Sequence, residues 1–294
     1  MAEDETVARF HRYKVGDIEI TAVSDGARHF AMPDGFILNA TRDEVNAALA
    51  DAAMPKDRMT TIYTPIVINT ASWNVLIDTG NGPDIASQPD TTYGHFQSNL
   101  KAAGIDSSLI DVVVISHFHA DHVNGLWAAD GTLAFPNAAI AVPANEWKFW
   151  MDDGEMARAP KGRMESLFNN NRRVFDPIKD TVIQYSWDRE VAPGVKAVGT
   201  PGHSIGHTSF LVSSDSQSVF VQSDVTNHPA LFARHPGWHA SFDQDPVQAE
   251  TTRRKIYEML VSEKMPVQGF HFPFLSPARV EREGDGYRVT PADI

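Results

Sequence analysis

Three histidines and an aspartate occur within six positions of the segment VVVISHFHADHVNG, which runs from Val112 to Gly125. His117 and His119 are two residues apart, so in an extended segment their imidazoles point the same way and can converge on one ion. Asp121 and His122 lie past the bend and can face a second ion. The alternative is a polar loop whose histidines only form hydrogen bonds, but four such residues so close together favour a metal site.

Further metal-ligating residues stand where later apolar strands end. VKAVGTPGHSIGH brings His203 after a strand and a Gly-rich turn, VFVQSDV brings Asp224, and VQGFHFPF brings His271. The chain has no Cys, so any ion must be held by His, Asp or Glu. Imidazoles combined with carboxylates suit Zn²⁺, and iron or manganese also fits such ligands.

Interleaved strands and helices must position these residues. The capping box of Thr41 and Glu44 predicts a helix over 41–53, and Asp245 and Pro246 predict the start of another that runs to about Glu263. A third helix is expected at 95–103. Apolar patterns predict strands at 18–23, 64–80 (two strands), 112–116, 138–142, 195–198, 208–212 and 219–222. This alternation indicates a layered α/β fold with a mixed sheet.

Composition narrows the class of protein. The 294 residues carry a formal net charge of −13, which argues against a nucleic-acid partner. The N-terminus MAEDETVARFHRYK lacks the basic stretch and apolar core of a signal peptide, so we expect a cytoplasmic protein. A periplasmic or secreted location would follow if a leader had been trimmed. No apolar run approaches the ~18 residues of a membrane span, so no membrane partner is expected.

The chain resembles the metallo-β-lactamase superfamily of metal-dependent hydrolases. The HxHxDH signature of that family is matched by His117, His119, Asp121 and His122, and its later ligands by His203, Asp224 and His271. The early Asp of the family matches Asp78 in NVLIDTG. The resemblance implies an αββα sandwich, two mixed sheets flanked by helices. We expect one domain over 1–294, with residues 1–60 as an N-terminal extension that packs on the sandwich.

The resemblance also implies how two divalent ions are shared. His117, His119 and His203 would hold one ion, Asp121, His122 and His271 the other, and Asp224 would bridge them. A bridging hydroxide would then be the nucleophile, with Asp121 or Asp224 as carrier of the released proton. Asp78 would orient a ligand histidine, although a plain strand-end turn residue is the alternative. His207, four residues past His203, is expected to support a ligand or the local structure.

The second half of the chain resembles the branch that contains methyl parathion hydrolase and related lactone and aryl-ester hydrolases. The shared features are the long loop after Asp224, Asp243 and Asp245 before a basic helix, and a Gly-Tyr-Arg strand near the end of the chain. The expected activity is hydrolysis of lactones or aryl esters, with phosphotriesters as possible further substrates. The alternatives from the same superfamily are a glutathione-thioester hydrolase and a mononuclear iron sulfur dioxygenase, and a non-catalytic binding protein is a third.

Aromatic residues near the motifs predict a pocket for a small neutral, apolar or aromatic substrate. We expect its lining to include Trp150, Leu231 and Phe232, although core packing is the ordinary role of such residues. Because relatives in this branch are often dimers, a homodimer is also expected.

Overall fold

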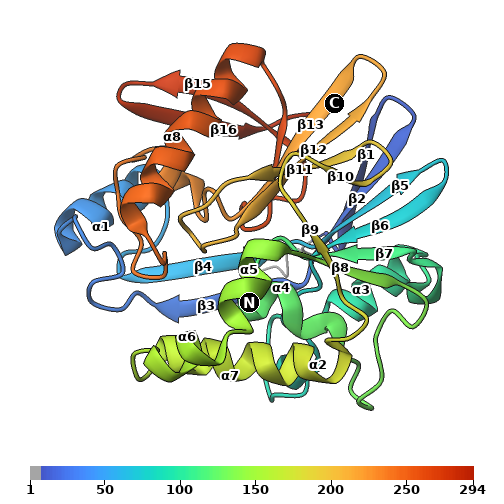
Figure 1. Ribbon diagram of the computed structural model, residues 1–294. Coiled ribbons are helices and arrows are strands. Elements are labelled where there is room, and N and C mark those ends of the chain that lie inside the picture. The colour runs from blue at the N-terminus through green and yellow to red at the C-terminus, as the bar shows by residue number, and fades with distance from the viewer. Residues whose placement is uncertain (1–7) are drawn as a thin grey trace.

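A computed structural model describes residues 8–294 and contains two seven-stranded sheets (Figure 1). The first sheet runs in the order β1-β2-β5-β6-β7-β8-β9. Its strands pair antiparallel from β1 to β6 and parallel from β6 to β9. The bounds are β1 Phe10–Val15, β2 Ile18–Val23, β5 Ile66–Thr70, β6 Trp73–Ile77, β7 Val112–Val114, β8 Ala139–Pro143 and β9 Ile183–Tyr185.

The second sheet takes its strands in sequence order from β10 to β16. All neighbours are antiparallel except β13 and β14, which are parallel because α8 crosses over between them. The bounds are β10 Glu190–Ala192, β11 Val195–Gly199, β12 Thr208–Ser214, β13 Gln217–Ser223, β14 Val267–Gly269, β15 Ala278–Glu283 and β16 Gly286–Pro291. A separate hairpin is formed by β3 Gly26–Ala31 and β4 Arg58–Tyr63.

Helices cover the outer faces of both sheets. Figure 1 shows α8 beside β15 and β16, with α5 next to β8 and α7 below α5 on the other side of the molecule. The bounds are α1 Arg42–Asp51, α2 Pro83–Ala86, α3 Phe96–Ala102, α4 Ala120–Val123, α5 Ala144–Trp150, α6 Asp153–Arg158, α7 Arg163–Phe175 and α8 Pro246–Glu263. The structure therefore confirms the αββα sandwich. No helix in the described residues 8–294 is long and apolar enough to cross a membrane.

The core between the sheets is mostly aliphatic and is built from alternate residues of both sheets. Ile68 and Val75 of the first sheet and Val195, Phe210 and Val221 of the second belong to one buried cluster. A second cluster lies between the first sheet and its helices, and a third lies beneath α8. Each sheet thus buries both faces, which explains the nearly continuous apolar character of β7.

Two helices begin where the sequence predicts. Thr41 accepts a hydrogen bond from the backbone N–H of Glu44, whose side chain returns to the Thr41 N–H, so the predicted capping box is confirmed. Asp245 caps α8 through the backbone N–H of Gln248 at 2.9 Å, and α8 ends at Glu263 as predicted.

Within the expected N-terminal extension, β1 is an edge strand of the first sheet, and β2 lies between β1 and β5 and pairs with both. The first seven residues of that segment, which are half of the N-terminal stretch MAEDETVARFHRYK, lie outside the described residues. The assignment of 1–294 to one domain stays a prediction.

Candidate metal centre

The candidate ligands lie just beyond the carboxyl ends of strands from both sheets. The loop after β7 carries His117 and His119, and the loops after β11, β13 and β14 carry His203, Asp224 and His271. Parallel and neighbouring strands bring these ends to one edge of the sandwich. The centre therefore lies where the first sheet meets the second.

One glycine is required by this arrangement. Gly202, next to His203, has φ +129°, and a Cβ there would lie 2.3 Å from the backbone nitrogen of Ala249 in α8. A side chain would collide with backbone that cannot yield. The Gly-rich turn before His203 thus lets its loop pass close to the start of α8.

Three imidazoles form the first cluster. The Nδ1 atom of His119 lies 3.0 Å from Nε2 of His117 and 2.9 Å from Nε2 of His203. All three side chains are buried. Three nitrogens at such spacing can share one tetrahedral ion and leave its fourth position open. The structure thus brings together the three histidines that the family resemblance assigns to one ion.

A second cluster contains Asp121, His122 and His271. An Oδ2 oxygen of Asp121 lies 3.5 Å from Nε2 of His122 and 3.4 Å from Nε2 of His271. The Nε2 atom of His122 is buried without a hydrogen-bond partner. An orphaned buried nitrogen is costly unless an ion completes it, so this donor set fits a metal.

Asp224 lies between the two clusters. Its Oδ2 is 3.3 Å from Nε2 of His203 and 3.0 Å from Nε2 of His271, and its Oδ1 is 3.4 Å from Nε2 of His122. That Oδ1 is also buried without a hydrogen bond. One carboxylate therefore faces ligand nitrogens of both clusters, which is the position of a bridging ligand.

The second ring nitrogen of three ligand histidines, His122, His203 and His271, is held by a neighbour, which fixes which nitrogen faces the cluster. Asp78 Oδ2 lies 2.8 Å from Nδ1 of His122, and Asp243 Oδ1 lies 2.7 Å from Nδ1 of His203. The carbonyl of Ile62 accepts from Nδ1 of His271 at 2.6 Å.

Asp78 combines both roles considered from the sequence. It follows β6 with a left-handed φ of 61°, as a strand-end turn residue does. Its carboxylate also accepts from the backbone N–H and hydroxyl of Ser116, both at 2.7 Å, as well as contacting His122. His207 is buried, and its Nε2 accepts the backbone N–H of Asp224 at 3.0 Å.

The electrostatics divide the centre into two parts. Burial and the neighbouring histidines lower the pKa of His117 and of His119 well below the usual value, which keeps these imidazoles neutral. Burial also opposes the charging of His122, but the carboxylates, led by Asp78, outweigh it and raise the pKa of that imidazole. Despite burial, His271 and His122 hold the pKa of Asp224 well below its usual range. The carboxylate side of the centre thus attracts positive charge.

A buried carboxylate that the sequence did not reveal joins two ligand loops. Glu146, in α5, accepts from the backbone N–H of Phe118 at 2.9 Å and from the hydroxyl of Ser204 at 2.7 Å. Phe118 lies between His117 and His119, and Ser204 follows His203. The glutamate stands among aromatic residues in NEWKFW, and no spacing in the sequence distinguishes it.

Arg163 is a second residue that the sequence did not reveal. It is the first residue of α7, and its Nη2 lies 3.4 Å from Nε2 of His119. Asp243, whose acidic motif was noted without a role, also reaches the centre by binding His203.

The three residues expected to line the substrate pocket are packed in the interior. Trp150 is 0% exposed and donates its indole N–H to Glu146 at 2.9 Å. Leu231 and Phe232 are at most 1% exposed and belong to a core cluster with α1. Their contact with substrate stays a prediction.

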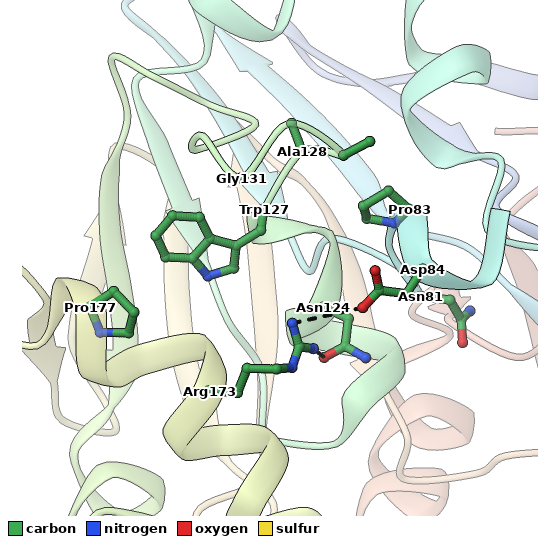
Figure 2. A pocket seen from close by; sticks show the side chains of 10 residues that line it. Asn81, Pro83, Asp84, Asn124, Trp127, Ala128, Gly131, Arg173 and Pro177 are labelled. Atoms are coloured by element: carbon green, nitrogen blue, oxygen red, sulfur yellow. Dashed lines mark hydrogen bonds and ion pairs between the residues drawn. The ribbon is translucent and has the colours of Figure 1, made fainter. Parts of the chain in front are cut away.

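An open pocket lies next to the ligand loop rather than on it. Figure 2 shows Trp127, Asn124 and Arg173 around a cavity of about 440 Å³ that none of the candidate ligands lines. The Arg173 guanidinium donates to Asn124 Oδ1 at 3.1 Å and lies 3.9 Å from Asp84. Its charge is already paired within the cavity wall.

The other loop histidines have ordinary structural partners. His228 accepts from the backbone N–H of Ala230, His235 stacks on Trp238, and His239 lies 2.9 Å from a Glu250 oxygen.

A model of the Metallo-beta-lactamase superfamily matches residues 64–260. This range contains six of the seven candidate ligands, all but His271. The chain belongs to the metallo-beta-lactamase superfamily. The resemblance stated from the sequence is therefore confirmed at the level of the superfamily.

Curated relatives of this superfamily member are consistent with a lactonase branch. An N-acyl homoserine lactonase of Bacillus thuringiensis is 28% identical over 166 residues, which are 56% of this chain and 57% of that protein. The AttM lactonase of Agrobacterium fabrum is 25% identical over 169 residues, 50% of this chain and 57% of that one. The chain thus spans little more than half the length of the curated relatives that it matches.

Solved structures agree over nearly the whole chain. AidC, a dizinc quorum-quenching lactonase, superposes with a TM-score of 0.89 at 22% identity and 99% coverage of both chains. The hydrolase AbOPH of the beta lactamase superfamily gives 0.88 at 26% identity, again with 99% coverage of both. The agreement with AidC shows the shared fold.

Proposed function

We propose that this chain is a dinuclear metal-dependent hydrolase that opens lactones, with N-acyl homoserine lactones as the favoured class. The observation that carries the proposal is the position of Asp224, whose two oxygens face nitrogens of two complete ligand clusters. A site for one ion would not need the second set. The names of the curated relatives support the substrate class.

The residues present fit two divalent ions, for which we propose zinc. His117, His119 and His203 would hold one ion and Asp121, His122 and His271 the other, with Asp224 between them. Such a pair polarises the attacked carbonyl and supplies a bridging hydroxide near neutral pH. The two orphaned atoms, Nε2 of His122 and Oδ1 of Asp224, support this occupancy.

The side chains around the ligands orient them and handle the proton. Asp78 and Asp243 hold the rings of His122 and His203 so that each Nε2 faces inward. Of the two candidate proton carriers, Asp121 has a side chain that is 23% exposed, whereas Asp224 is 3% exposed. We therefore assign the released proton to Asp121, which can pass it to solvent.

Aryl esters and phosphotriesters are proposed as secondary substrates. Both reactions gather negative charge on an oxygen beside the ions, so the same centre can stabilise them. A lactone keeps its leaving group attached after ring opening, and the product is a hydroxy acid. The expected homodimer is likewise a proposal, which light scattering of the purified protein tests.

The test is metal analysis combined with a substrate panel. We expect two zinc ions per chain and faster turnover of an acyl-homoserine lactone than of dihydrocoumarin, an aryl acetate or methyl parathion. His122→Ala should lose one ion and most activity, while His29→Ala, an exposed histidine in β3, should change neither. One iron per chain with a harmless His122→Ala would instead support the sulfur dioxygenase alternative.

A further inference from the structure

A break between two helices places Arg163 beside the first cluster. α6 ends at Arg158 and α7 begins at Arg163, with Pro160 and Gly162 between them. Gly162 has φ +96°, a conformation that lets the chain turn sharply into α7. The Arg163 side chain then extends from the exposed surface to within 3.4 Å of the buried His119.

His119 cannot serve as the partner of this guanidinium once an ion is bound. Its Nδ1 faces His117 and His203, so Nδ1 is the nitrogen that would bind the ion. A neutral imidazole that ligates through Nδ1 carries its proton on Nε2, and Nε2 then accepts no hydrogen bond. Two donors would face each other across 3.4 Å.

Arg163 has no close ion-pair partner among the described residues. In the part of the chain that the structure describes, no carboxylate forms an ion pair with it within 4.0 Å, although other surface arginines such as Arg158 have one. The carboxylates of Asp121 and Asp243 act on Arg163 from farther away, and Asp243 already binds His203 at 2.7 Å and lies 3.7 Å from Arg253. Asp121 belongs to the second cluster. The Arg163 guanidinium, with its five N–H donors, is therefore available to a hydrogen-bond acceptor of an incoming substrate.

The position of Arg163 fixes how far from the reaction it acts. The guanidinium lies on the outer edge of the His119 ring, and an ion held by Nδ1 would lie beyond the inner edge, so roughly 6 to 8 Å would separate the two. Arg163 therefore contacts a part of the substrate that lies beyond the atom under attack. In a lactone with an acylamino group on the neighbouring carbon, the amide oxygen lies four bonds from the attacked carbonyl carbon.

We propose that Arg163 binds the amide oxygen of an acylamino lactone and so makes the centre prefer such substrates over plain lactones. The inference rests on the proposed lactonase function and adds a specificity-determining residue to it. It also adds one polar contact to a site for which the sequence predicted only apolar recognition.

The test compares two lactones that differ only in this group. One is N-hexanoyl homoserine lactone, and the other carries an alkyl chain of equal length in place of the acylamino group. A hydrogen bond to a charged group predicts that Arg163→Met lowers kcat/KM for the acylamino lactone about 10- to 100-fold, mainly through KM. The loss should exceed that on the alkyl lactone by about tenfold or more, and Arg163→Lys should recover part of it.

Controls separate this inference from the proposed function. Arg158→Met removes an exposed arginine of α6 that pairs with Glu155, and it should change neither rate. Metal content should stay at the wild-type value in Arg163→Met. Equal losses on both lactones, or no loss on either, would overturn the role of Arg163 while leaving the lactonase function intact. A metal-loaded wild type that opens neither lactone would reject both proposals.

Discussion

Replacing Glu146 with glutamine tests whether one buried carboxylate holds two ligand loops together. Each oxygen of Glu146 accepts two donors. Oε2 receives the backbone N–H of Phe118 and the indole N–H of Trp150, both at 2.9 Å. Oε1 receives the hydroxyl of Ser204 at 2.7 Å and the backbone N–H of Gly206 at 2.5 Å. An ionised carboxylate satisfies all four, because it offers only acceptors.

Glutamine cannot satisfy the same four donors. Whichever way its amide lies, the NH₂ group faces two donors. If the NH₂ group faces Trp150 and Phe118, the N–H groups of both residues lose their acceptor. If it faces Ser204 and Gly206, the Ser204 hydroxyl can rotate to accept, but the Gly206 N–H loses its acceptor. A buried unsatisfied donor costs about 1–3 kcal/mol, and lost charge-assisted bonds add to it. The expected loss in the free energy of unfolding is about 2–5 kcal/mol.

Urea unfolding of the metal-free protein measures this loss, and a zinc competition assay measures the second effect. Because the clamped loops carry His117, His119 and His203, we expect the affinity of this cluster for zinc to fall about 10- to 100-fold. Glu281→Gln is the matched control, since Glu281 is an exposed residue of β15 that pairs with Arg288. That change should stay within about 0.5 kcal/mol.

Two results would refute the reasoning. A Glu146→Gln protein as stable as the control would show that the four hydrogen bonds do not constrain the loops. A selective loss of the ion held by Asp121, His122 and His271 would show that Glu146 supports that cluster and not the one formed by the three histidines.

Three further predictions concern metals, pH and packing. Removing the ions with a chelator should lower the melting temperature and zinc should restore it, since free ion at 100 times its Kd stabilises the fold by about 2.7 kcal/mol per site. A melting temperature that the chelator does not change would argue against bound ions. Burial raises the pKa of Asp25 to about 6, against the hydrogen bonds from Asn81 and Phe96 that lower it. The folded chain therefore holds a proton that the unfolded chain releases, so this stabilisation is complete below about pH 4 and is lost as the pH rises through 6. A pKa rise of this size corresponds to about 3 kcal/mol, and Asp25→Asn should flatten that part of the curve of unfolding free energy against pH. Gly125→Ala would place a Cβ 1.9 Å from the carbonyl oxygen of Thr79 and should cost about 3 kcal/mol or more in urea unfolding. Gly154→Ala in α6, whose added Cβ would meet only side-chain atoms, should cost far less, and equal losses would contradict the packing argument.

Local sequence patterns predicted the parts of the fold that depend on neighbouring residues. The capping box at Thr41 and the Asp245–Pro246 start of α8 are such signals, and both helices begin where expected. The candidate ligands could be found for the same reason, because each follows an apolar strand within a few residues. The structure brings all seven together at one edge.

Residues that act across the fold could not be found in this way. Glu146 matters because α5 packs beside two loops that are distant from it in sequence, and Arg163 because a helix break directs it toward His119. Neither contact produces a recognisable spacing of residues in the sequence. For a related reason the sequence did not reveal that Trp150, expected in the pocket lining, is buried and donates to Glu146.

Because the ligands are divided between the two sheets, the two ligand clusters can be completed only in a certain order during synthesis on the ribosome. His117 and His119 emerge with the first sheet, but His203, Asp224 and His271 belong to strands that are synthesised later. Neither cluster is complete until the second half of the chain has folded against the first. A nascent or truncated chain that ends before β14 lacks His271, so the second ion can be loaded only after nearly all of the protein has been made.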